Sequence, residues 1–467
     1  MSDLRDWRRR AAMAAALVGA LLGSPGARAA RETAGALRWQ DDFQAPGGFG
    51  FASFLDVQGR RAFAAGTIVN EAGNPDFILR AYDLHRGEVL WSEEYDAAGG
   101  PDQALTTAAS EDGVFIAGRS AAQPGNFDFV VRAHDPATAA LLWEDRFDAT
   151  GRRDAAFWIA ADQGRVFAVG QATNAARNSD FLVRAYDAKT GALLWTDQVD
   201  GGGFDVANVV RVAGDRLLVG GNISTAGNAG FGVRVYEVST GALLWEDRLD
   251  LGGHVGGAHG IAAQDGQVFV SGFAVDAAGN ADFVVRAYAL DTGAVLWQDR
   301  FDSGPDDEAF DVGVSAGRVV ACGLATASDG SSDWIVRAYD AGTGAFVWGD
   351  RLDLGRADVA FDLDTRGSEV FVSGRGGTLA RFGGAGGTDF LVRGYDIRDG
   401  SLLWQDRFDL AGGDDEAPTT LVAKGDVAVV GGDARNASGG IDFLVRAYEL
   451  GPTDPDSADG GSEPSGR

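Results

Sequence analysis

A tryptophan-containing phrase recurs along this chain at nearly constant intervals, and this repeat constrains the fold more than any other feature. The phrase reads Asp-Phe-x-Val-Arg-Ala-Tyr-Asp, a Thr-Gly turn, and Ala-Leu-Leu-Trp-x-Asp-Arg-Phe-Asp, with small variations. Repeats of about 50 residues are typical of propellers and solenoids, which grow as one unit rather than as separate domains. The tryptophan occurs at Trp39, Trp91, Trp143, Trp195, Trp245, Trp297, Trp348 and Trp404.

Each repeat has the pattern of four short strands. In the sixth repeat we expect strand A at residues 309–314, strand B at 318–322, strand C at 333–339 and strand D at 345–352, separated by glycine-containing turns. Helical periodicity is absent beyond the N-terminal segment. Four strands in a period near 50 residues predict one propeller blade per repeat.

The two ends of the repeat array predict how the ring closes. Residues 36–43 contain Trp39 and form a D strand without preceding A, B and C strands, whereas residues 443–450 form a C strand without a following D strand. Joining them removes two exposed sheet edges. We therefore predict an all-β fold over residues 30–450: an eight-bladed β-propeller of four-stranded antiparallel blades. Blade 8 combines residues 36–43 with 414–450, so the N-terminal strand pairs with the C-terminal blade.

The segments outside the propeller predict export. Residues 1–29 have a basic start (Arg5 and Arg8–Arg10), an apolar stretch at 11–23 too short to span a bilayer, and small residues at Ala27 and Ala29 for signal-peptide cleavage. Export could use the general secretory or the twin-arginine route. Residues 451–467 are expected to be a disordered acidic tail. We expect a periplasmic or extracellular protein that is not inserted in a membrane.

Charge and cysteine content narrow the function classes. The formal net charge is −28, and removal of residues 1–29 would change it to −31, because five arginines and two aspartates are lost. Such a surface repels nucleic acid and favours cations or basic partners. Cys322 is the only cysteine, so an intramolecular disulfide cannot form.

The repeat also contains a recurring arginine and a recurring aspartate. Asp145 lies between Trp143 and Phe147 along strand D, and burial of a carboxylate there is costly without a cation. We expect the strand C arginine of the same blade to supply it, and eightfold recurrence indicates architecture rather than catalysis. The predicted pairs are Arg80–Glu93, Arg132–Asp145, Arg184–Asp197, Arg234–Asp247, Arg286–Asp299, Arg337–Asp350, Arg393–Asp406 and, across the closure, Arg446–Asp41.

The phrase from strand C to strand D resembles the repeat of quinoprotein-type (PQQ-like) β-propellers. The third repeat runs Ala185-Tyr-Asp-Ala-Lys-Thr-Gly-Ala-Leu-Leu-Trp195, and the family phrase is Ala-x-Asp-x-x-Thr-Gly-x-x-x-Trp. The resemblance covers residues 36–450 and implies eight blades docked to one another by tryptophans. The blade connections also look like those of bacterial short β-propeller repeat proteins.

The resemblance implies functions of two classes. Quinoprotein dehydrogenases hold PQQ with a calcium ion, a carboxylate base and commonly a disulfide, but this chain has one cysteine and no such carboxylate set apart from its repeat. The family also includes a non-catalytic, partner-binding lipoprotein of the outer-membrane barrel assembly machinery, whose lipid-bearing cysteine is missing here. We expect a monomeric, non-catalytic module without PQQ that binds a protein or extracellular polymer. A quinone- or metal-dependent oxidoreductase and a structural cell-surface protein are the alternatives.

Aspartates recur in the connections between strand D and the next strand A. They could ring one mouth of the channel and bind Ca²⁺, which prefers oxygen ligands, or each could cap its own turn. These candidate metal ligands are Asp102, Asp154, Asp205, Asp307, Asp358 and Asp415.

Departures from the repeat are the candidate partner-binding residues. The seventh repeat has a longer connection at residues 374–388, where Arg375, Arg381 and Phe382 could contact an anionic ligand or partner. The fifth repeat contains His254 and His259, which would need further ligands to bind a transition metal and could instead be solvated or packed. Trp158, in the inner strand of the third repeat, could line the channel.

Overall fold

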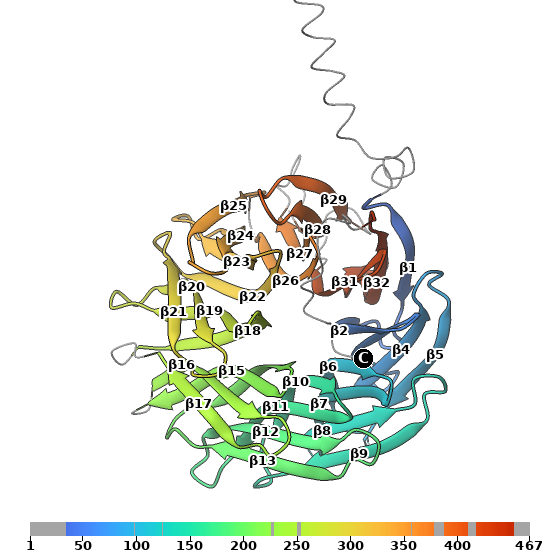
Figure 1. Cartoon of the computed structure of the whole chain (residues 1–467). Coiled ribbons are helices and arrows are strands. Elements are labelled where there is room, and N and C mark those ends of the chain that lie inside the picture. Colours follow the sequence, from blue (N-terminus) through green and yellow to red (C-terminus); the bar gives the residue numbers. More distant parts are fainter. Residues whose placement is uncertain are drawn as a thin grey trace, which may run out of the picture.

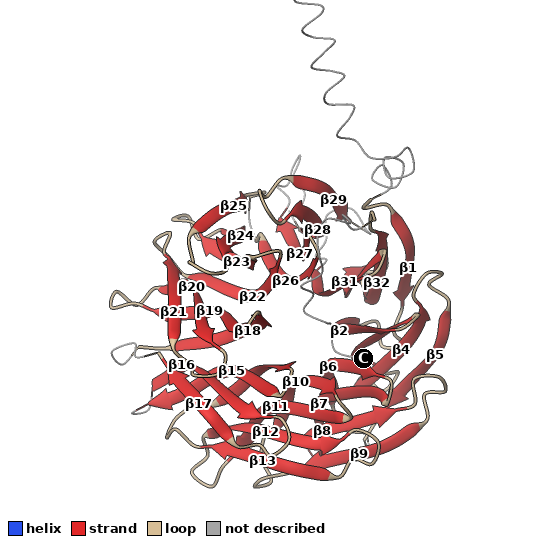
Figure 2. Ribbon diagram, in the orientation of Figure 1, coloured by secondary structure: helices blue, strands red, loops and turns tan. Residues whose placement is uncertain are grey.

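Eight four-stranded antiparallel sheets surround a central axis in the computed structural model of this chain (Figure 1). The structure describes residues 34–97, 99–123, 125–225, 228–249, 254–355, 357–377, 387–409 and 417–452. Within these ranges every regular element is a strand, as Figure 2 shows. None of the described residues forms a helix with the length and apolar character needed to cross a membrane.

Consecutive strands A to D make up each blade, with A nearest the axis and D at the rim (Figure 1). Blades 1 to 4 contain β2 (Gly50–Gln58), β3 (Arg61–Val69), β4 (Pro75–Asp83), β5 (Val89–Tyr95); β6 (Asp102–Ser110), β7 (Gly113–Gln123), β8 (Asn126–His134), β9 (Leu141–Phe147); β10 (Ala155–Asp162), β11 (Arg165–Thr173), β12 (Ser179–Asp187), β13 (Leu193–Val199); β14 (Val206–Ala213), β15 (Arg216–Thr225), β16 (Asn228–Glu237) and β17 (Leu243–Arg248).

The second half of the ring repeats this order and ends with the composite blade. Blades 5 to 8 contain β18 (Gly256–Gln264), β19 (Gln267–Val275), β20 (Ala281–Ala289), β21 (Val295–Phe301); β22 (Asp307–Ser315), β23 (Arg318–Thr326), β24 (Ser332–Asp340), β25 (Phe346–Leu352); β26 (Val359–Arg366), β27 (Glu369–Gly377), β28 (Thr388–Asp396), β29 (Leu402–Phe408); β30 (Ala417–Lys424), β31 (Val427–Arg435), β32 (Ile441–Glu449) and β1 (Leu37–Phe43).

The ring closes as the sequence predicts. Strand β1 pairs antiparallel with β32, so that Trp39 lies opposite Ala447 and Phe43 opposite Phe443. Blade 8 therefore takes its outer strand from the beginning of the chain and its other three strands from the end. This pairing confirms the predicted all-β, eight-bladed architecture and its closure.

A tryptophan of each rim strand docks its blade to the next one. The indole Nε1 of Trp143 in β9 donates a 2.8 Å hydrogen bond to the carbonyl of Ala188, in the C–D turn of blade 3. The ring lies against Gly191 of that turn, whose φ is +71° and where an added Cβ would lie 2.7 Å from the indole. Glycine is thus required twice, for the left-handed backbone and for the space. The tryptophan of one blade and the Thr-Gly turn of the next blade therefore pack against each other.

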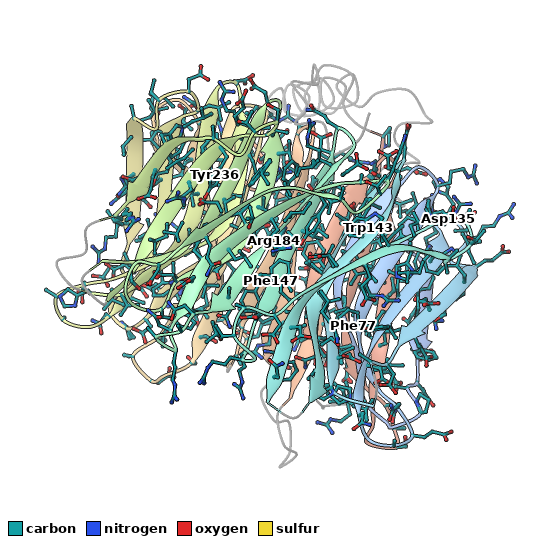
Figure 3. The ribbon with its side chains drawn as sticks, turned by 90° about the horizontal axis from the view of Figure 1, so that it is seen from below. Phe77, Asp135, Trp143, Phe147, Arg184 and Tyr236 are labelled. Carbon is teal, nitrogen blue, oxygen red and sulfur yellow. The ribbon has the colours of Figure 1, made fainter. Side chains whose placement is uncertain are left out.

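The repeated arginines and aspartates form ion pairs between blades, so the prediction of pairs within a blade is wrong. Arg184 Nη2 lies 3.2 Å from Asp145 Oδ2 of the preceding blade, and Tyr186 donates a 2.8 Å hydrogen bond to the same oxygen. Figure 3 shows Arg184 beside Phe147. The observed pairs are Arg80–Asp41, Arg132–Glu93, Arg184–Asp145, Arg234–Asp197, Arg286–Asp247, Arg337–Asp299, Arg393–Asp350 and Arg446–Asp406.

Strand register explains the correction. Arg132 lies directly opposite Glu144, whereas Asp145 lies opposite Val131. Directly opposed residues share a sheet face and neighbouring residues take opposite faces, so Arg132 and Asp145 point to different sides of blade 2. Each arginine therefore reaches back to the preceding blade, and each aspartate receives the arginine of the following blade.

Candidate functional site

The aspartates of the D–A connections fold inward onto their own loops. Asp154 is fully buried; its Oδ2 accepts a 2.7 Å hydrogen bond from the Ala149 amide and its Oδ1 a 2.6 Å bond from the Thr173 amide. Burial raises the pKa of Asp154 to about 6 despite these two bonds. Three further aspartates are equally buried, and each ties the D–A connection that precedes it to the end of strand B in its own blade: Asp205, Asp307 and Asp358.

Asp102 departs from this arrangement, and Asp415 lies outside the described residues. Asp102 Oδ2 accepts a 2.5 Å bond from the Ala97 amide, but its buried Oδ1 accepts no backbone hydrogen bond. The nearby Ser120 hydroxyl lowers the pKa of Asp102, while burial, the larger influence, raises it. The amide that would correspond to that of Thr173 belongs to Ala121 and donates to the Pro101 carbonyl instead.

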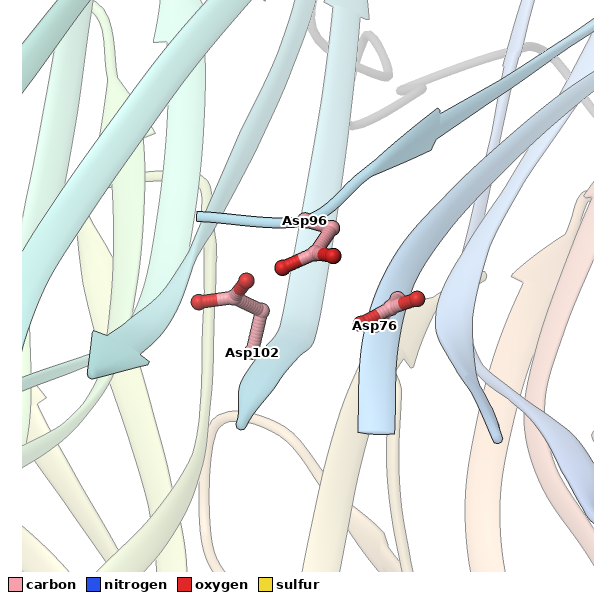
Figure 4. Close-up of side chains that lie close together, drawn as sticks. All are labelled: Asp76, Asp96 and Asp102. Atoms are coloured by element: carbon pink, nitrogen blue, oxygen red, sulfur yellow. The ribbon is translucent and has the colours of Figure 1, made fainter. Parts of the chain in front are cut away.

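Asp102 belongs to a cluster of carboxylates between blades 1 and 2. One carboxylate oxygen each from Asp76, Asp96 and Asp102 lies within 4.8 Å of the others, and Figure 4 shows the three side chains gathered where their strands end. Asp76 and Asp102 are buried and Asp96 is exposed. The corresponding residues at blades 6 and 7, Asp333, Asp353 and Asp358, form a second such cluster.

An exposed aspartate directly follows most rim strands. These aspartates lie on the face formed by the D–A and B–C connections and give that face its charge. Five of these aspartates, each in a different blade, form no ion pair with another described residue: Asp96, Asp148, Asp200, Asp302 and Asp353. We call them the acidic ring. The opposite face, formed by the A–B and C–D turns, instead mixes both charges; for example, Arg216 pairs with Asp291 and Lys189 with Asp112.

Each rim strand begins with exposed apolar residues. In blade 2, Leu141 is 48% and Leu142 45% exposed, and the other blades have apolar residues at both matching positions except blade 8, where Arg38 follows Leu37. The outer edge of the rim strand has no strand partner within the described chain. The rim is therefore a second surface that a protein partner could contact.

The inner strands hold the channel wall together by side-chain hydrogen bonds. Ser53 Oγ donates to the Ala104 carbonyl of the next blade at 2.8 Å. The half-buried Asp56 carboxylate accepts 2.7 Å bonds from the amides of Val57 and of Ala109, which lies in the next blade. Burial raises the pKa of Asp56 to about 6.

Further carboxylates lie in the channel at blades 6 and 7. Asp311 and Asp362 hydrogen-bond to each other, and burial raises the pKa of both, that of Asp311 to about 6. Asp362 Oδ2 also accepts a 2.5 Å bond from the Leu421 amide of blade 8. A hydrogen bond from the protonated carboxyl of one residue to the ionised carboxylate of the other accounts for the contact between Asp311 and Asp362. The pair therefore serves to join blades 6, 7 and 8.

A small cavity lies beside these carboxylates. It has a volume of about 40 Å³, and its lining includes Arg211, Asp311 and Asp364. This space accommodates a few water molecules, whereas pockets for cofactor-sized ligands measure about 300 Å³ or more. The cavity is therefore smaller than a pocket for a cofactor-sized ligand. Elsewhere in the channel, Trp158 contacts Phe54 edge to face with ring centroids 4.7 Å apart, so Trp158 does line the channel.

Of the predicted partner-binding residues, the structure describes His254, His259 and Arg375. His259 Nδ1 lies 3.2 Å from Glu308 Oε1, and burial lowers the pKa of His259 to about 4. His254 and His259 belong to no group of metal-ligating side chains among the described residues. The Arg375 guanidinium lies 5.5 Å from the centre of the Phe361 ring. Arg381 and Phe382 lie outside the described residues.

Sequence reasoning missed the channel carboxylates and the Asp76–Asp96–Asp102 cluster. Asp311 and Asp362 could have been noticed because each places a carboxylate in the middle of an inner strand. The cluster joins the beginnings of β4 and β6 with the residue that follows β5, so only the fold brings the three aspartates together.

Solved structures similar to this chain share its fold at low sequence identity. Quinohemoprotein alcohol dehydrogenase ADHIIG from Pseudomonas putida HK5 is 13% identical, with 94% of this chain and 79% of that chain covered and a TM-score of 0.54. A europium-containing methanol dehydrogenase is 11% identical, with 92% and 95% covered and a TM-score of 0.53. Sqt1 of Chaetomium thermophilum, solved bound to the N-terminus of the ribosomal protein L10, is 13% identical, with 88% and 98% covered and a TM-score of 0.57.

Sequence comparison with protein families gives a more specific result. No curated protein sequence matches the chain. A family model described as outer membrane protein assembly factor BamB matches residues 75–282 and 281–441, which together span most of the propeller. The chain therefore belongs to the PQQ-like β-propeller family that this model describes.

Proposed function

We propose that this chain is a non-catalytic binding module that holds a basic segment of a protein partner on the face bearing the acidic ring. The observation that carries the proposal is the ring itself, whose five exposed carboxylates have no ion-pair partner among the described residues. Unneutralised charge of one sign attracts a partner of the opposite sign and speeds its association.

The contrast between the two faces supports this choice of surface. Several aspartates of the turn face already pair with arginines, as Asp340 does with Arg318 and Asp426 with Arg38. A basic partner would have to displace those arginines, whereas the acidic ring offers its charge directly. The family model is described as an assembly factor, and Sqt1 was solved with a protein segment bound; both agree with a partner-binding role.

An oxidoreductase that uses a quinone or a metal is the second candidate, because two of the similar structures are dehydrogenases. The narrow cavity beside Arg211 and Asp364 argues against a quinone at that place. An experiment in which purified protein is incubated with PQQ and Ca²⁺ distinguishes between the two functions. Stoichiometric quinone binding with reduction of an electron-accepting dye would establish the oxidoreductase and refute the binding module as the sole role.

The direct test of the binding module is a comparison of two variants in pull-downs from an envelope extract of the source cell. The ring variant carries Asp148→Asn, Asp200→Asn, Asp302→Asn and Asp353→Asn. Its matched control also removes four exposed carboxylates, in this case from the turn face: Glu111→Gln, Asp215→Asn, Asp265→Asn and Asp291→Asn.

A Lys/Arg-rich partner should be retained by the wild type and the control, weakened at least tenfold by the ring variant, and released by 0.5 M NaCl. Equal retention by both variants would refute the proposed face. A third variant, Leu141→Ser with Leu142→Ser, shows whether the apolar rim carries the binding instead.

Export is proposed on the basis of residues 1–29, which lie outside the described residues. The mature N-terminus should be Ala30 when the protein is recovered from the periplasm or medium. Recovery of the uncleaved chain from the cytoplasm would contradict it.

A further inference from the structure

Seven blades have a buried aspartate near the start of strand C, and in four of them an arginine of the rim strand neutralises it. Arg351, for example, lies 2.5 Å from Asp333. In blade 4, where Gly230 replaces the aspartate, the equivalent Arg248 turns to Glu246 at 2.5 Å. The pairs of this kind are Arg146–Asp128, Arg300–Asp282, Arg351–Asp333 and Arg407–Asp389.

Blade 1 retains the aspartate and has a carboxylate at the partner position, as blade 8 does with Asp442 and Asp42. Blade 3 has Gln198 there, which donates a 2.6 Å hydrogen bond to Asp180. Glu94 lies opposite Ile78 in the register position that Arg146 occupies opposite Val130 in blade 2. Asp76, which should receive the arginine, is only 4% exposed. No described lysine or arginine lies within ion-pair distance of Asp76, Glu94 or Asp96.

Asp76 has one carboxylate oxygen bound and one unsatisfied. Its Oδ2 accepts a 2.8 Å hydrogen bond from Asn70 Nδ2, while its buried Oδ1 has no hydrogen-bond partner. Burial raises the pKa of Asp76 to about 6, against the bond from Asn70, and the charges of Asp96, Asp102 and Glu94 raise it further. Four carboxylates therefore meet where four other blades place a guanidinium.

We propose that Asp76, Asp96 and Asp102, with Glu94, bind one Ca²⁺ ion that takes the place of the missing arginine between blades 1 and 2. The three aspartates already bring oxygens within 4.8 Å of one another, two of them from buried side chains (Figure 4). Ca²⁺ takes six to eight oxygen ligands in flexible geometry, so water can complete its shell beside the exposed Asp96 and Glu94. Mg²⁺ demands a stricter octahedron and should bind more weakly.

The second carboxylate cluster is an internal control. One carboxylate oxygen each from Asp333, Asp353 and Asp358 also lies within 4.8 Å of the others, but Arg351 already lies against Asp333. A guanidinium and a calcium ion compete for the same oxygens, so this cluster should bind no cation. The contrast between the clusters thus depends on one position, glutamate in blade 1 and arginine in blade 6.

The experiment measures Ca²⁺ binding to the purified propeller after chelation, by calorimetry and by the luminescence of Tb³⁺, a Ca²⁺ substitute that Tyr95 can sensitise. The variants are Glu94→Arg, which introduces the arginine of those four blades, Asp96→Asn, and the control Asp353→Asn. The thermal midpoint of each is recorded with EDTA and with Ca²⁺, because a ligand that binds only the folded state raises it.

The wild type and Asp353→Asn should bind one Ca²⁺ per chain and melt several degrees higher with Ca²⁺ than with EDTA. Asp96→Asn should bind at least tenfold more weakly. Glu94→Arg should lose the site and the Ca²⁺ effect while melting at least as high as the wild type in EDTA; if it fails to fold, Glu94→Gln takes its place and should weaken binding at least threefold. No binding to the wild type, or binding unaffected by Asp96→Asn, would overturn the proposal. Because the probe is the ion alone, this result is independent of the proposed protein partner.

Discussion

The pairing of Arg184 with Asp145 across the boundary of blades 2 and 3 gives the sharpest stability prediction. Asp145→Asn removes the charge that accepts bonds from Arg184 Nη2 at 3.2 Å and from Tyr186 Oη at 2.8 Å. Arg184 is 9% and Asp145 27% exposed, so the guanidinium would remain buried without its carboxylate. Breaking a fully buried pair costs about 3–5 kcal/mol, and the partial exposure of Asp145 reduces our expectation to about 2–3 kcal/mol.

A double-mutant cycle in urea unfolding tests the pairing itself. Asp145→Asn and Arg184→Gln should be coupled by about 1–2 kcal/mol, because each substitution removes the same contact. Asp145→Asn and Arg132→Gln should be coupled by less than about 0.5 kcal/mol, since their side chains lie on opposite faces of blade 2. Coupling to Arg132 in place of Arg184 would refute the inter-blade assignment.

Two further predictions concern the channel and the blade contacts. The folded-state pKa of Asp56 is raised to about 6, so its contribution to stability is complete below its unfolded pKa near 4 and is lost as the pH rises through 6. Asp56→Asn should therefore flatten the fall of the thermal midpoint between about pH 4 and 7. The pKa of His259 is lowered to about 4, so its contribution to stability changes with pH in the opposite direction. The measured quantity is therefore the difference in thermal midpoint between Asp56→Asn and the wild type. An unchanged slope of the midpoint against pH would count against the assignment. Gly191→Ala should cost more than about 2 kcal/mol in urea unfolding, because the backbone is left-handed and the new Cβ would lie 2.7 Å from Trp143, whereas Gly59→Ala, left-handed in open space, should cost about 1 kcal/mol; equal costs would contradict the docking role.

The architecture was accessible from the sequence because the propeller repeats one local solution eight times. Trp39 without preceding strands and residues 443–450 without a following strand were enough to predict the closure that β1 and β32 form. The Thr-Gly turn and the tryptophan were recognisable as recurring partners, although only the structure shows that Trp143 docks on Gly191 of the next blade.

The ion pairs and the candidate sites were less accessible because they depend on register and on contacts between blades. Shifting strand register by one residue moves a side chain to the other face, and Arg132 lies opposite Glu144 rather than Asp145. The D–A aspartates look alike in sequence, yet Asp154 is satisfied by two amides whereas Asp102 belongs to a carboxylate cluster. The substitution at Glu94 was visible in the repeat, but its meaning required the contact between Arg351 and Asp333.

The central functional claim is that a basic partner binds the face that carries the acidic ring. Carbodiimide cross-linking joins carboxylates to lysines in direct contact, so mass spectrometry of the cross-linked complex reports the face used. We predict links from the partner's lysines to Asp148, Asp200, Asp302 and Asp353. Links confined to Glu111, Asp215 and Asp265, which are exposed on the opposite face, would contradict the account.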